Sequence, residues 1–130
     1  MKNLIGSMLM MMSLICYGEQ WDSVVSNEND TVFFFDPNSV KKNGDLVQYW
    51  ELTNFKEKLK SGKTVVSSSK SLVEVDCKNN RYRNIQVIDF EKEFGLGGIV
   101  NVDISGEKNW YLSPKESVSS VMEQKMCGRK

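Results

Sequence analysis

The sequence predicts an α+β fold in which an antiparallel β-sheet of about five to six strands carries one C-terminal helix on one face. Three observations predict it. Runs of β-branched and aromatic residues, separated by turn residues, occupy most of the chain. One amphipathic stretch follows near the C-terminus. Two cysteines, one at the end of a predicted strand and one beyond that stretch, can tie the helix to the sheet.

The first eighteen residues have the layout of a secretory signal peptide. A positively charged start precedes an apolar run over 4–15, and Gly18 supplies a small residue before the polar Glu19. An apolar run of about a dozen residues is too short to cross a bilayer core, which needs about 20. We therefore expect a signal peptide over 1–18, a mature domain over 19–130, and export to the periplasm, the cell surface or the medium.

Export makes the cysteine count informative. Loss of the leader removes Cys16 and leaves Cys77 and Cys127, which can form one intramolecular disulfide in an oxidising compartment. The alternatives are two free thiols or pairing with another protein. Lipoproteins acylate a cysteine placed like Cys16, but a small residue normally precedes it. The bulky Ile15 therefore argues against a lipid anchor at Cys16.

Strand-forming segments alternate with turns along the mature chain. The predicted strands are 21–25, 31–35, 46–53, 64–77 and 81–90, with 99–104 as a candidate short sixth. Turns are expected at 27–30, 36–39, 42–45 and 78–80, where Asn, Asp, Gly and Pro concentrate. Residues 55–62 are ambiguous, because alternating lysines suit an exposed strand whereas Lys-Ser-Gly-Lys suits a turn. The glycine-interrupted stretch 91–106 is expected to be the least regular part.

Alternation within two of these strands predicts which side chains share a face. Side chains expected on one face of 46–53 are Val47, Tyr49 and Glu51, with Leu46, Trp50 and Leu52 opposite. Val73, Val75 and Cys77 share a face of the strand over 64–77. Cys77 is therefore expected to point inward with the two valines.

The C-terminal stretch predicts one amphipathic helix from Pro114 to about Met126. Ser113 is placed to cap it, Pro114 suits the first helical position, and Glu116 completes a capping box. The side chains that fall on one helical stripe are Val118, Val121, Met122 and Met126. Cys127 lies off that stripe, so the helix is expected to end just before it.

The composition excludes several classes of function. With 17 basic and 17 acidic residues, the chain has no global field to attract nucleic acid. No apolar run after the leader reaches spanning length, so we expect no transmembrane segment. The absence of histidine removes Ser-His-Asp and Cys-His nucleophile pairs and His-liganded zinc. We therefore expect no enzyme, no cofactor and no metal site.

Two motifs that suggest chemistry have simpler explanations. The glycine-rich stretch Gly95–Gly98 is not followed by Gly-Lys-Ser/Thr, so it is interpreted as a loop and not as a phosphate-binding loop. Asp36 and Asp76 could be a carboxylate pair, but a turn cap and a solvated strand end explain them better.

Basic residues in two segments form the candidate partner-binding site. They are Lys56, Lys58, Lys60, Lys63, Lys78, Arg81 and Arg83. If the sheet brings the two segments together, they form a basic edge that could hold an acidic partner, a glycosaminoglycan or an anionic surface. The alternative hypothesis is that lysines line an edge strand and prevent edge-to-edge aggregation.

Several segments, taken in order, resemble one known family. They are Trp21 at the start of the mature chain, Phe33-Phe34-Phe35-Asp36-Pro37-Asn38-Ser39-Val40, Val47-Gln48-Tyr49-Trp50-Glu51-Leu52, Ser69-Lys70-Ser71, Val75-Asp76-Cys77-Lys78, an arginine-containing strand, Trp110 before Ser113-Pro114, and Cys127. The chain is similar in these segments to the surface-adhesin protein E family of Gram-negative bacteria. The resemblance covers most of the mature chain.

This resemblance implies an antiparallel sheet with a C-terminal helix packed on one face and tied by the disulfide. The family takes its name from an adhesin that binds host extracellular-matrix proteins, although no binding residue carries over by motif. We therefore expect a non-enzymatic, adhesin-like binding protein, periplasmic, secreted or surface-associated, whose partner is a host extracellular-matrix or envelope protein. The alternative hypothesis is a periplasmic enzyme inhibitor or envelope-maintenance factor.

Overall fold

The computed structural model describes residues 19–24 and 31–128 of the chain. The predicted signal peptide over 1–18, the Cys16 position and the turn predicted at 27–30 lie outside the described residues. Within the described part, no helix is both long and apolar enough to cross a membrane.

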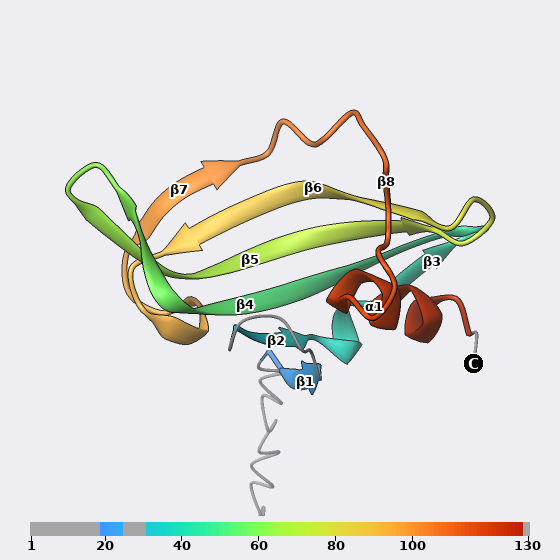
Figure 1. Cartoon of the computed structure of the whole chain (residues 1–130), viewed down its shortest axis with the longest axis horizontal. Coiled ribbons are helices and arrows are strands. Elements are labelled where there is room, and N and C mark those ends of the chain that lie inside the picture. The colour runs from blue at the N-terminus through green and yellow to red at the C-terminus, as the bar shows by residue number, and fades with distance from the viewer. Residues whose placement is uncertain (1–18, 25–30, 129–130) are drawn as a thin grey trace, which may run out of the picture.

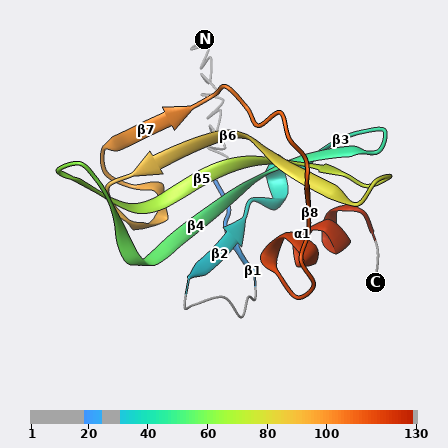
Figure 2. The same cartoon turned by 45° about the horizontal axis from the view of Figure 1, so that its top comes forward.

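The fold is a curved antiparallel sheet with one helix, α1 (Val118–Met126), against one face (Figures 1 and 2). The strands are β1 (Asp22–Val24), β2 (Val32–Phe35), β3 (Lys41–Asn43), β4 (Leu46–Ser61), β5 (Thr64–Asp76), β6 (Arg81–Phe90), β7 (Ile99–Asp103) and β8 (Tyr111–Leu112). Their order is β1-β2-β4-β5-β6-β7, with β3 also paired to β4 and β8 to β6. The predicted fold class is confirmed, although the described residues form eight strands and not five to six.

Two long strands form the centre of the sheet. β4 and β5 pair from Leu46↔Asp76 to Ser61↔Thr64, with a register shift between Asn54 and Leu59. The ambiguous segment 55–62 is therefore mostly the continuation of β4. Gly62 makes the tight turn to β5 with φ of 63°, a left-handed conformation that glycine adopts without steric cost.

The main core lies between α1 and one end of the sheet. The helix contributes Val118, Met122 and Met126, which the predicted stripe contained. From the sheet, Val47, Tyr49, Val73 and Val75 join the core on the face that strand alternation predicted, and Val24 and Phe35 belong to the same cluster. Met122 is fully buried, and burying one such side chain contributes about 1.5–3 kcal/mol.

A disulfide between Cys77 and Cys127 joins the end of β5 to the end of the helix. The two Cα atoms are 5.6 Å apart, within the usual range for a disulfide. Both cysteines pack at the rim of the core beside α1. The predicted bridge and the inward orientation of Cys77 are confirmed.

The predicted start of the helix is wrong by one turn. Ser117, and not Ser113, is the N-cap, and its Oγ accepts a hydrogen bond from the backbone N–H of Ser120 at 3.1 Å. Glu116 has φ of 62°, which is incompatible with a right-handed helix, and Ser117 N–H donates to the carbonyl of Pro114 to close a turn. Ser113 instead donates its hydroxyl hydrogen to the Glu123 carboxylate at 2.9 Å.

The disulfide should stabilise the position of α1. Removing it with Cys127→Ser releases a loop with a sequence separation of 50, and loop-closure entropy then predicts a loss of about 4 kcal/mol in the free energy of unfolding. Amide hydrogen exchange should accelerate first in 118–126. The measurements are thermal melting and exchange mass spectrometry, with the reduced wild-type protein as the matched comparison. Unchanged melting and unchanged helix exchange would contradict this role.

Candidate functional site

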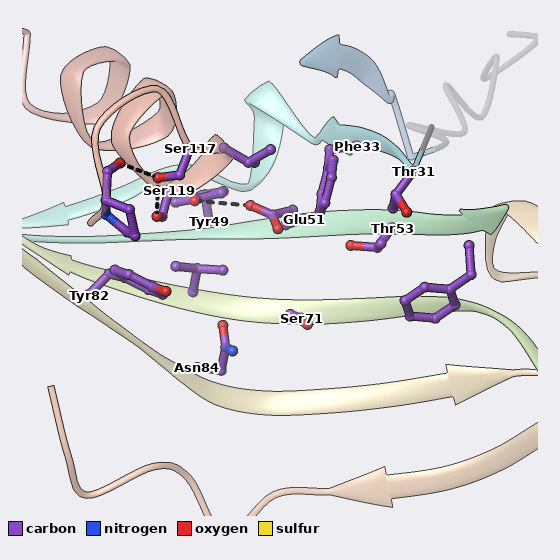
Figure 3. Close-up of a pocket in the computed structure, with 14 residues that line it drawn as sticks. Thr31, Phe33, Tyr49, Glu51, Thr53, Ser71, Tyr82, Asn84, Ser117 and Ser119 are labelled. Atoms are coloured by element: carbon purple, nitrogen blue, oxygen red, sulfur yellow. Dashed lines mark hydrogen bonds between the residues drawn. The ribbon is translucent and has the colours of Figure 1, made fainter. Parts of the chain in front are cut away.

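A cleft of about 460 Å³ opens on the helix-bearing face of the sheet, beside the start of α1 (Figure 3). Strands β2, β4, β5 and β6 and the segment around the N-cap of the helix supply its walls. The lining residues are Thr31, Phe33, Tyr49, Glu51, Thr53, Phe55, Ser71, Val73, Tyr82, Asn84, Pro114, Ser117, Val118 and Ser119. The volume lies within the range of small-molecule sites, roughly 300–1,000 Å³.

Strand alternation and register place the polar side chains of the cleft. Tyr49, Glu51 and Thr53 occupy every second position of β4 and so project from the same face. Ser71 stands directly opposite Glu51 on β5, and Phe33 stands opposite Thr53 on β2. Cross-strand neighbours on one face lie about 5 Å apart at Cβ, so these side chains share one small space.

Glu51 is the acidic residue among the described residues that line the cleft. Its carboxylate accepts a hydrogen bond from the Tyr49 hydroxyl at 3.2 Å, and Figure 3 shows the two side chains facing each other along β4. Burial penalises the ionised form and raises the pKa of Glu51 from 4.5 to about 7, while the Tyr49 hydrogen bond offsets part of that effect. Burial, together with the charge of Glu51, raises the pKa of Tyr49 well above its usual value.

Acidic side chains on the opposite face of the sheet are paired with arginines. Arg83 Nε donates to Glu74 and Arg81 Nε donates to Asp76, both at 2.9 Å. Both guanidinium groups lie over the ring of Trp110. The Cζ atom of Arg81 is 4.7 Å from the ring centre, and that of Arg83 is 4.2 Å from it. These two arginines, predicted to contact a partner, therefore make charge-assisted bonds within the fold.

The interpretation of Asp76 as a solvated strand end is wrong. Asp76 is buried, and its carboxylate accepts hydrogen bonds from the Asn79 side chain, from Arg81 and from the backbone N–H groups of Lys78 and Asn79. These donors, the Asn79 amide first among them, lower the pKa of Asp76. Asp36 does cap the turn predicted for it, since it accepts from the N–H of Asn38 at 2.9 Å.

The predicted basic residues fall into two groups at opposite ends of the sheet (Figure 1). Lys56, Lys58, Lys60 and Lys63 lie at the β4–β5 hairpin, whereas Lys78, Arg81 and Arg83 lie at the β5–β6 turn. The turns at the two ends of β5 are separated by its 13 residues, or about 40 Å. Successive hairpins in an antiparallel sheet turn at opposite ends of their shared strand. The structure therefore does not bring the two groups together. 

The glycine-rich stretch forms a loop that is fastened to the sheet. Gly95 N–H donates to Ser68 Oγ at 2.9 Å, and Phe94 N–H donates to the side-chain oxygen of Asn54 at 2.8 Å. These amides are therefore used within the fold. Residues 19–24 and 31–128 contain no group of three or more His, Cys, Asp or Glu side chains that could hold a metal ion.

The comparisons with known proteins identify the family. The sequence model of the family "Surface-adhesin protein E" matches residues 21–128, which is most of the chain. The chain belongs to the surface-adhesin protein E family. The resemblance seen in the sequence is thereby confirmed. No curated protein matches the sequence.

Solved structures of Haemophilus influenzae protein E share the fold. One aligns with 13% sequence identity and a TM-score of 0.64, and the alignment covers 85% of this chain and 90% of that one. Crystal form II of the same protein gives 14% identity and a TM-score of 0.61, with 74% of this chain and 80% of that chain covered. Protein E from non-typeable H. influenzae gives 11% identity and a TM-score of 0.60, with coverage of 85% and 86%. At these identities the likeness establishes the fold alone.

The cleft was not predicted from the sequence, although one signal pointed to it. Strand alternation places Glu51 on the same face as Val47 and Tyr49, which the structure buries in the core. A carboxylate on a face that is otherwise apolar is an unusual position, because burying a charge carries a desolvation penalty. The extent of the cleft could not be predicted, because it depends on where α1 begins.

Replacing Glu51 should stabilise the protein at alkaline pH. The folded-state pKa of about 7 exceeds the ordinary 4.5, so the folded protein holds the proton more tightly and loses stability as pH rises from 4.5 through 7. This rise corresponds to at most about 3 kcal/mol, and partial solvent access reduces it. We expect Glu51→Gln to raise the free energy of unfolding by about 2 kcal/mol at pH 8 and by almost nothing at pH 4.

Urea denaturation at both pH values checks this expectation. Glu57→Gln is the matched control, because Glu57 is an exposed glutamate on the same strand. It should give no comparable gain at pH 8. An equal gain for Glu51→Gln at both pH values would show that ionisation of Glu51 is not the cause.

Proposed function

We propose that the chain is an exported, non-enzymatic, adhesin-like binding protein that contacts a protein of the host extracellular matrix or of the bacterial envelope. Membership of the surface-adhesin protein E family supports this function. The layout of residues 1–18 as a signal peptide supports export. The disulfide that joins the end of β5 to the end of the C-terminal helix suits an oxidising compartment.

The single observation that carries the proposal is a surface suited to partner contact. This surface is the hairpin tip, defined as residues 56–65. Its exposed side chains include four lysines, Lys56, Lys58, Lys60 and Lys63, against one acidic residue, Glu57. Leu59 and Val65 add apolar area, with 52% and 36% of their surface exposed. A projecting element that mixes basic and apolar side chains suits an acidic protein surface, because charge steers the encounter while apolar contact adds affinity.

The hairpin tip extends away from the part of the sheet that carries α1 and the disulfide (Figures 1 and 2). Contact there would leave the core undisturbed. Lys78, Arg81 and Arg83 lie at the other end of the sheet, so we propose the hairpin lysines alone as the partner-binding basic edge.

Charge reversal in the hairpin tip should weaken partner binding. We expect Lys58→Glu with Lys60→Glu to lower affinity at least tenfold for a matrix or envelope protein that binds wild type, mainly through slower association. Lys41→Glu with Lys42→Glu is the matched control, because these two exposed lysines lie on β3 at the other end of β4. Surface plasmon resonance against purified matrix proteins and against envelope extract measures both variants.

Equal binding by wild type and both variants would contradict the hairpin tip as the contact surface. Loss of binding in both variants would show a diffuse charge effect. Wild-type binding should also weaken as salt rises from 50 to about 500 mM, because exposed charges are screened.

Protease treatment of intact cells tests the adhesin-like role. An adhesin must reach its partner outside the cell, so the hairpin tip should be cleaved without disrupting the envelope. Complete protection in intact cells, with cleavage after osmotic shock, would place the protein in the periplasm. That outcome would replace the adhesin-like role by that of a periplasmic inhibitor or envelope-maintenance factor.

A further inference from the structure

The Glu51 carboxylate has no cationic partner among the described residues, and this distinguishes it from two other carboxylates of the sheet. Glu74 and Asp76 are buried, and each forms an ion pair with an arginine at 2.8–2.9 Å. Glu51 accepts its hydrogen bond from a neutral tyrosine hydroxyl at 3.2 Å. The fold thus neutralises the carboxylates of one face and leaves that of the other face open to the cleft.

The chemistry of the cleft lining favours a cation over an anion. Among the described residues, the lining contains one carboxylate and no lysine or arginine. Ser71, Thr53 and Asn84 add oxygen atoms that can accept hydrogen bonds. The N-terminal end of α1 lies at the rim, where Ser117 Oγ accepts from the N–H of Ser120 and so satisfies one of the first backbone donors of the helix.

Aromatic rings line the same cleft. Phe33 comes from β2, Phe55 from β4 and Tyr82 from β6. Their faces can hold the hydrocarbon stem of a ligand and attract a positive charge. At about 460 Å³, the cleft is large enough for a short chain with one charged end.

We propose that this cleft binds a cationic group, an alkylammonium or a guanidinium, which donates hydrogen bonds to Glu51 and to neighbouring hydroxyls while its stem lies against the rings. The group can come from a free small amine or from a lysine or arginine side chain of a protein. This site is separate from the hairpin tip and goes beyond the function proposed above.

Few other groups near Glu51 in the described part of the chain can influence its ionisation. Its own strand contributes Tyr49, β6 contributes Tyr82, and the facing positions on β2 and β5 are Phe35 and Ser71. From α1, Lys125 Nζ lies 5.5 Å from the Phe35 ring centre and makes no ion pair with Glu51, while Glu123 is bonded to Ser113. A bound cation favours the ionised carboxylate, so affinity should rise with pH and fall about tenfold per unit well below the Glu51 pKa of about 7.

Nuclear magnetic resonance titration of the exported protein tests the site. The probes are butylammonium and butylguanidinium as free cations, the peptide Gly-Gly-Arg-Gly-Gly as a protein side chain, and butanol and butyrate as neutral and anionic controls. We expect the cationic probes to shift the backbone amides of 49–53 and 71 at pH 8, and to do so at least tenfold more weakly at pH 5.5. Butanol and butyrate should leave these signals in place.

Two variants separate the site from a general charge effect. Glu51→Gln keeps the shape of the side chain and should lower the affinity for both cations at least tenfold at pH 8. Glu57→Gln, on the exposed part of the same strand, should bind like wild type. Because Glu51→Gln is expected to stabilise the fold, its loss of binding cannot be assigned to unfolding.

The outcomes decide between ligand sources and can overturn the proposal. Binding of the free cations alone supports a small amine, whereas tighter binding of the arginine peptide supports a protein side chain. The proposal is overturned if no cationic probe perturbs the cleft, if butanol binds as well as butylammonium, or if Glu51→Gln binds like wild type. Loss of partner binding by the hairpin variants has no bearing on these results, so the two proposals can fail independently.

Discussion

A short helix must cover a long sheet, and the rest of the structure depends on this mismatch. Helix α1 has nine residues and is about 14 Å long, whereas β5 has 13 residues and extends about 40 Å. The helix can therefore bury only one end of the sheet face. The disulfide from Cys77 to Cys127 fixes which end, because Cys77 follows directly after β5. The uncovered part of the same face, beside the start of the helix, is the cleft.

The two faces of the sheet differ in whether their carboxylates form ion pairs. On the face away from α1, Glu74 and Asp76 are matched by arginines that stack beneath Trp110, so buried charge is compensated inside the fold. Tyr111, the residue after Trp110, lies on the helix face. Its ring centre is 6.0 Å from that of Tyr82. Among the described residues, Glu51 remains the acidic group of the cleft on that face. Pairing avoids the cost of an uncompensated buried charge on one face, whereas an unpaired carboxylate on the other face can interact with an added cation.

Sequence patterns were sufficient to predict the long elements. They failed where tertiary contacts determine the structure. The strand over 81–90 was predicted exactly, because turn residues precede it and its own residues favour strands. Strands β3 and β8 have three and two residues, too few for alternation to show. The helix start was misplaced because Ser113 and Ser117 can both cap a helix, and only the turn at Pro114 excludes Ser113.

The predicted basic edge is two separate groups in the structure, because strand pairing, and not sequence distance, places Lys60 far from Arg81. The environment of Glu51 needed the position of α1, which no local pattern contains.

The disulfide also determines how the fold responds to mechanical load. Cys77 and Cys127 enclose 78–126 in a covalently closed loop that contains β6, β7, β8 and α1. Tension applied at the C-terminus therefore passes from Cys127 through the sulfur atoms into the end of β5, without stretching the enclosed segment. Within the described residues, only the part of the chain before Cys77 can then be drawn out. To do so, the load must shear the long pairing of β4 with β5 or peel β1, β2 and β3 from the sheet edge.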